Sequence, residues 1–102
     1  MPTDPPFNGL TPAEAERLAM LAEEAGEVVQ IVGKILRHGY DSYHPANPNV
    51  TNRELLDDEI GDLLAVAKRM ISVSDIEGDY ELADFNAIWK RKMRYSHHQG
   101  LS

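Results

Sequence analysis

The chain of 102 residues contains no cysteine, which excludes disulfide bonds, thiolate metal sites and cysteine nucleophiles. It also lacks any run that approaches the ~18 consecutive apolar residues of a membrane span. Its first residues, MPTDPPFNG, carry neither the basic nor the apolar segment of a secretory signal. We therefore expect a cytoplasmic protein with no membrane partner.

Basic residues are scarce as well, because 10 Lys and Arg stand against 17 Asp and Glu, a net charge of −7. General nucleic-acid binding depends on neutralising phosphates, so this charge argues against such a partner. The length fits one domain, residues 1–102. A chain of this size buries only about two-thirds of its unfolded surface, which favours self-association.

No alternating strand pattern is present, and the periodicity predicts an all-α fold of three helices. Thr11, Pro12 and Glu14 form a capping-box signature at the start of the first helix, which should end after His38, before Gly39. A break in this helix at Gly26 or Gly33 remains open, since glycine weakens a helix. The other predicted elements are helices at about 52–73 and 80–95, an extended arm at 1–10, a loop at 39–50, a turn at 75–79 and a frayed tail at 96–102.

Several acidic residues project onto the apolar faces of the first two helices. At ~100° per residue, Glu24 falls inside the apolar arc of the first helix and Glu27 at its edge, whereas Glu23 lies on the polar side. In the second helix, Glu59 lies within the apolar stripe and Asp62 at its margin. Buried carboxylates need a compensating charge, and almost no Lys or Arg lies in these arcs.

Two such pairs on facing helices would make an all-oxygen cage, which suits Mg²⁺ or Mn²⁺. A ferritin-like di-iron site is disfavoured, because it would need histidine three residues after Glu24 and Glu59. The alternative is that both pairs are ordinary acids on solvated helix faces, since helix rotation is only inferred.

The segments Glu23-Glu24-Ala25-Gly26-Glu27 and Glu59-Ile60-Gly61-Asp62 resemble the EExxE…ExxD signature of the MazG-like all-α nucleoside triphosphate pyrophosphohydrolases. The resemblance covers about residues 15–95. It implies an antiparallel helical bundle completed by homo-oligomerisation, as a dimer or tetramer. It also implies Mg²⁺-dependent cleavage of an NTP or dNTP to NMP and pyrophosphate, with a role in nucleotide-pool sanitation. The segment between the two half-motifs is longer than in compact members, and the extra length falls in the loop at 39–50.

By the same resemblance, Glu24, Glu27, Glu59 and Asp62 are the metal ligands, and Glu23 orients or deprotonates the attacking water. Lys34 and Arg37 are candidates for binding the substrate's phosphates, although basic residues near a helix C-terminus also complement the helix dipole. The basic cluster at 90–94 and the aromatic residues of the loop are weaker candidates for substrate contacts. Two other functions stay open: phosphoribosyl-ATP pyrophosphohydrolase activity, and a non-catalytic helical interaction module.

Overall fold

The computed structural model describes residues 7–78 and 80–99, and their order of elements is α1, α2, α3 and a short 3₁₀ helix. Helix α1 spans Pro12–His38, without a break at either interior glycine. The Thr11 side chain accepts a hydrogen bond from the Glu14 N–H, and the Glu14 carboxylate accepts one from the Thr11 N–H, which completes the predicted capping box. The helix ends at Gly39, whose φ of 90° strongly favours glycine.

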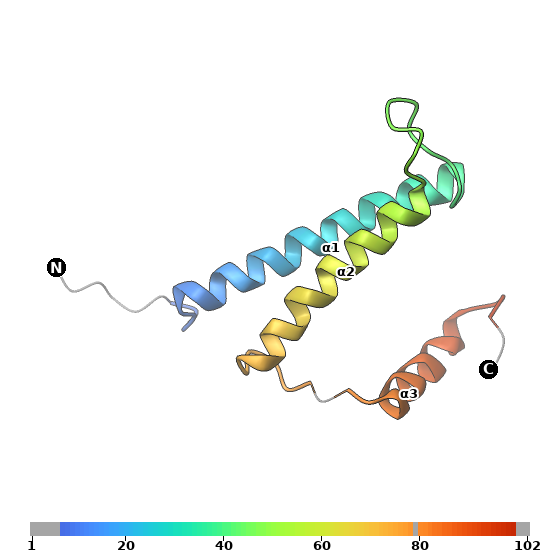
Figure 1. The fold of residues 1–102 in the computed structure, drawn as a ribbon. Helices are drawn as coiled ribbons and strands as arrows, with labels where there is room; N and C mark the ends of the chain where they lie inside the picture. The colour runs from blue at the N-terminus through green and yellow to red at the C-terminus, as the bar shows by residue number, and fades with distance from the viewer. Residues whose placement is uncertain (1–6, 79, 100–102) are drawn as a thin grey trace.

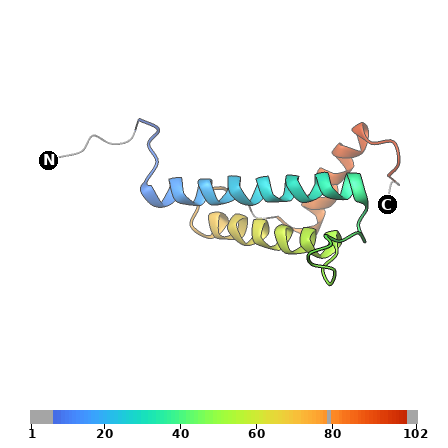
Figure 2. The same cartoon turned by 90° about the horizontal axis from the view of Figure 1, so that it is seen from above.

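Helix α2 spans Asn52–Ser72 and runs antiparallel beside α1 (Figures 1 and 2). Thr51 caps it by accepting a hydrogen bond from the Glu54 N–H at 3.2 Å. At the end of the hairpin away from the loop, Arg17 of α1 donates two hydrogen bonds to Asp75, which follows α2, from Nε at 2.5 Å and from Nη2 at 3.0 Å. The predicted boundaries of both long helices are thus correct to within a residue.

The loop between the two helices is fixed to the start of α2 by backbone hydrogen bonds. The Asn52 N–H donates to the Ser42 carbonyl at 2.9 Å, and the Arg53 N–H donates to the Tyr40 carbonyl at 2.8 Å. The Asn52 side chain, which is buried, donates to the Gly39 carbonyl at 3.2 Å. The predicted irregular loop is therefore a well-anchored turn structure.

Helix α3 spans Leu82–Lys92 and continues as a 3₁₀ helix over Met93–Tyr95, a shorter α-helix than the predicted 80–95. Within the described residues it packs against neither α1 nor α2, and Figure 1 shows it set apart beyond the linker. The predicted arm at 1–10 and the predicted tail at 96–102 lie partly outside the described residues. The last residue of the predicted turn at 75–79 also lies outside them.

The seam between α1 and α2 supplies the apolar core of the described residues. Ile31 and Met70 are buried there. Other apolar residues of the predicted arcs stay substantially exposed, because α2 covers only part of the apolar face of α1; they are Leu18, Met20, Val29, Val32 and Leu36 on α1, and Ile60 and Leu64 on α2. None of the helices in the described part of the chain is long and apolar enough to cross a lipid bilayer.

Candidate metal centre

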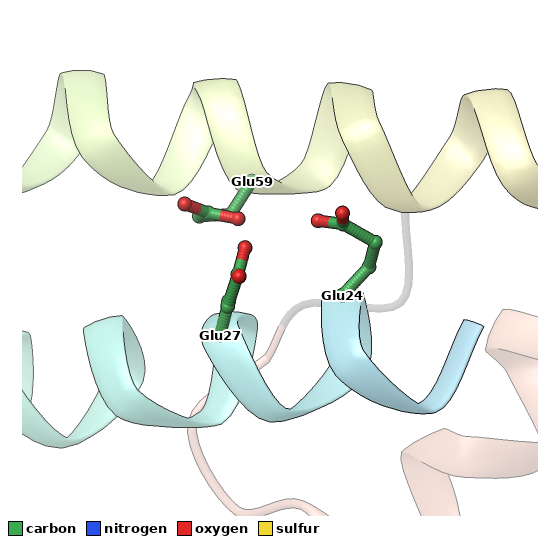
Figure 3. Close-up of side chains that lie close together, drawn as sticks. All are labelled: Glu24, Glu27 and Glu59. Carbon is green, nitrogen blue, oxygen red and sulfur yellow. The ribbon is translucent and has the colours of Figure 1, made fainter. Parts of the chain in front are cut away.

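Three glutamates converge between the two long helices. Glu24 and Glu27 lie one turn apart on α1, and Glu59 faces them from α2; Figure 3 shows the three carboxyl groups pointing into the space between the helices. One carboxylate oxygen from each residue lies within 4.8 Å of the other two. The i, i+3 spacing on α1 produces this geometry, since residues three apart share a helical face.

Two oxygens of this cluster have no hydrogen-bond partner. Glu24 Oε2 and Glu59 Oε2 are both buried and unpaired. A buried polar atom without a partner costs free energy, so such atoms need a ligand, a water or a proton. An all-oxygen, acidic donor set of this kind suits a hard divalent cation. The residues present therefore fit a metal ion of the Mg²⁺ type.

The electrostatics of the cluster favour protonated carboxyl groups when no cation is bound. Hydrogen bonding with the Glu27 carboxyl group, followed by burial, raises the pKa of Glu59 to about 7. Burial is the main cause that raises the pKa of Glu24, and the negative charge of Glu27 adds to it. Repulsion from neighbouring carboxylates adds to both shifts, and a bound cation would relieve that part.

The structure brings together three of the four predicted metal ligands. Asp62 is exposed and lies outside the group of three oxygens, although its negative charge contributes to raising the pKa of both Glu24 and Glu59. Its marginal place in the helical projection agrees with this position at the rim. Glu23, the candidate for positioning water, is exposed beside Glu24.

In the described part of the chain, no basic side chain forms an ion pair with a cluster glutamate. Among the described residues, the side-chain ion pairs are Arg17 with Asp75 and Arg53 with Asp41, and neither involves a cluster glutamate. The two predicted phosphate-binding residues, Lys34 and Arg37, instead line a pocket at the loop end of the hairpin.

Sequence reasoning did not single out Asn52, the buried polar residue of that pocket. Its sequence signal was a polar residue directly after an N-cap threonine, but its burial depends on the path of the loop.

The two aromatic residues of the loop lie in different surroundings. Tyr43 lines this pocket, whereas the Tyr40 ring lies under the Arg53 guanidinium, whose carbon is 4.4 Å from the ring centroid.

The described residues define an all-α protein whose helical hairpin carries convergent carboxylates with unpaired buried oxygens, a candidate oxygen-ligand site for a cation. The model of the MazG nucleotide pyrophosphohydrolase domain matches residues 13–100, and the chain belongs to this family. The family consists of hydrolases that cleave nucleotide phosphoric anhydrides and typically depend on a metal ion. Comparisons with curated proteins and with solved structures gave no significant match.

Proposed function

We propose that this protein is an Mg²⁺-dependent nucleoside triphosphate pyrophosphohydrolase, which converts an NTP or dNTP and water to NMP and pyrophosphate in nucleotide-pool sanitation. The observation that carries the proposal is the convergence of Glu24, Glu27 and Glu59, with two unpaired buried oxygens, between α1 and α2. This arrangement is costly without a cation and has the donors that Mg²⁺ prefers.

Glu24, Glu27 and Glu59 would hold the cation, and Asp62 would join them from the rim. When bound, Mg²⁺ supplies Lewis-acid chemistry, since it neutralises phosphate oxygens and lowers the pKa of water. Mn²⁺ has similar ligand preferences. By holding the cation, the four carboxylates would bring positive charge to the substrate's phosphates, which a chain of net charge −7 would otherwise repel.

Glu23 is the proposed catalytic base. Its exposed side chain sits next to Glu24 and can accept a proton from the attacking water. The water oxygen forms a bond to phosphorus while the anhydride bond between the α- and β-phosphates breaks, and pyrophosphate leaves. Positioning and electrostatic stabilisation account for most of the catalysis in phosphoryl transfer, so few groups are needed.

The exposed apolar residues support the proposal that the active form is a homo-oligomer, a dimer or tetramer. Val29 is 69% exposed and Leu36 81% exposed on α1, although both lie in its apolar arc. On α3, Leu82, Phe85 and Trp89 are also exposed. Large exposed apolar surfaces are typical of protein interfaces.

Release of pyrophosphate from dNTPs, NTPs and phosphoribosyl-ATP, with Mg²⁺ and with EDTA, tests this function. We expect Mg²⁺-dependent turnover of at least one NTP or dNTP, and its loss in Glu59→Gln. Glu16→Gln, an exposed position on α1, is the matched control and should keep the activity. Turnover of phosphoribosyl-ATP alone would move the assignment to histidine synthesis. No turnover of any substrate would leave a helical interaction module.

A further inference from the structure

A pocket of about 260 Å³ opens where α1 ends and α2 begins. Lys34, Arg37 and His38 line it from the last turns of α1, Ser42 and His44 from the loop, and Asn52 from α2. None of the described residues that line it is acidic, although the chain has 17 acids. The volume lies below the roughly 300–1,000 Å³ of pockets that enclose a whole drug-sized ligand, so it suits one part of a larger molecule.

The pocket is built in advance by the anchored loop. Its walls are held by the hydrogen bonds from Asn52 to Ser42 and Gly39, and by an antiparallel bridge between Tyr43 and Thr51. The first N–H groups of α2 already donate hydrogen bonds, to carbonyl groups of the loop and to the Thr51 hydroxyl. A ligand here must therefore be recognised by side chains.

The side chains that line the pocket are free to bind an anion. Within the described residues, Arg17 and Arg53 form ion pairs, whereas Lys34 and Arg37 form none. The His44 Nδ1 accepts a hydrogen bond from the Ala46 N–H at 3.0 Å, which leaves the Nε2–H as the donor of the ring. Arginine and lysine with an adjacent ring donor match phosphate oxygens.

The pocket and the glutamate cluster share one seam of the hairpin. Lys34 follows Glu27 by seven residues on α1, which places it on the same face about 10 Å further along the axis. On α2, Leu55 lines the pocket one turn before Glu59.

We infer that this pocket is the subsite for the terminal phosphate groups of the nucleotide, which orients the substrate along the seam with its polyphosphate toward the loop. The inference rests on the proposed function for the identity of the substrate. Its own basis is the pair of unpaired cations in a preformed pocket without acids. The direction of the substrate follows from the position of this pocket beyond the cluster.

Binding of pyrophosphate to the full chain in EDTA, measured by calorimetry, tests the subsite without the metal centre. The wild type should bind. Lys34→Met and Arg37→Met should each weaken binding about tenfold or more, the typical effect of losing a charged hydrogen bond. Lys68→Met, an exposed unpaired cation on α2, removes the same charge away from the pocket and should bind like the wild type. Circular dichroism should show unchanged helix content in all three.

Three outcomes would overturn the inference: no pyrophosphate binding by the wild type, an equal loss in Lys68→Met, or binding of an unphosphorylated nucleoside that the pocket variants weaken. The last would make the pocket a base subsite. Glu59→Gln separates this inference from the proposed function, because it should lose turnover and keep pyrophosphate binding in EDTA. If no nucleotide is hydrolysed but pyrophosphate binds as expected, the proposed function fails and the anion subsite stands.

Discussion

Glu59 combines three properties of the glutamate cluster in one residue. It contributes the α2 carboxylate to the cluster, it has a buried oxygen without a partner, and its pKa is raised to about 7. An acid whose pKa is raised in the folded state stabilises the fold fully below its unfolded pKa of 4.5 and loses this contribution as the pH rises through about 7. Above that pH, the metal-free cluster opposes folding.

Glu59→Gln should therefore raise the melting temperature of the metal-free protein at pH 8, by roughly 5 °C, while abolishing Mg²⁺ binding. The amide keeps the shape of the side chain and removes its charge. Scanning calorimetry in EDTA and Mg²⁺ titration measure the two effects, with Glu16→Gln as the control that should change neither. A variant that binds Mg²⁺ normally, with unchanged metal-free stability, would contradict the metal centre.

Asp75 shows the opposite behaviour, because the Arg17 guanidinium beside it lowers the pKa of its carboxyl group below 3.8. A group whose pKa is lowered by folding stabilises the folded state at a pH above its pKa in the unfolded chain. This stabilisation disappears as the pH falls through its pKa in the folded state. The two side chains are only 21% and 11% exposed, so solvent screens the pair less than it would a surface pair.

Asp75→Asn should lower the melting temperature by roughly 5 °C at pH 7, and the difference from the wild type should vanish at a pH below the lowered pKa. Thermal melts across the acid range measure this. Asp58→Asn, at an exposed position on α2, should show little change. A constant difference down to the most acidic pH would mean that the ion pair is not its cause.

Among the elements, the start of α2 carries most of the order of the loop. Thr51 caps the helix with its hydroxyl group and bridges to Tyr43 with its backbone, next to the buried Asn52. The same few residues thus fix the helix start and the loop that forms one wall of the pocket.

Thr51→Ala should reduce the free energy of unfolding by about 1 kcal/mol, because it removes the acceptor for the Glu54 N–H. Chemical denaturation measures the loss. Thr51→Ser keeps the hydroxyl group and should stay close to the wild type; if both variants lose stability equally, the cap is not the reason.

The helices themselves were largely predictable, since capping threonines and Gly39 fixed the boundaries of α1 and α2 locally. The i, i+3 spacing also predicted the cluster glutamates, because it depends only on helix geometry. Two features were not predictable. The pocket depends on where the loop bends back onto Asn52, and the shorter α3 has no packing partner in the described residues that would extend it.

For the whole molecule, the notable property is how little of it packs on itself. The Cα radius of gyration is 18.1 Å, against about 13 Å for a compact chain of this length. The face of α1 that α2 does not cover leaves apolar side chains exposed. This face is the surface that a second copy would cover in the proposed oligomer.

Val29→Glu should shift the protein toward monomers, since it places a charge on the uncovered apolar face of α1. The neighbouring Gln30→Glu adds the same charge at an exposed polar position and should leave the assembly intact. Light scattering after size exclusion measures both. A wild type that elutes as a monodisperse monomer would contradict homo-oligomerisation.

In the proposed oligomer, the separation of α3 from the hairpin would make the folding of this protein depend on its concentration. A helix of 11 residues is marginal in water unless its apolar face is packed. If copies of the chain pack against one another's α3, each tenfold dilution shifts the equilibrium toward separate chains and lowers the stability of the folded state. The cell could then adjust the amount of folded enzyme, and not merely the number of chains, by changing how much of the protein it makes.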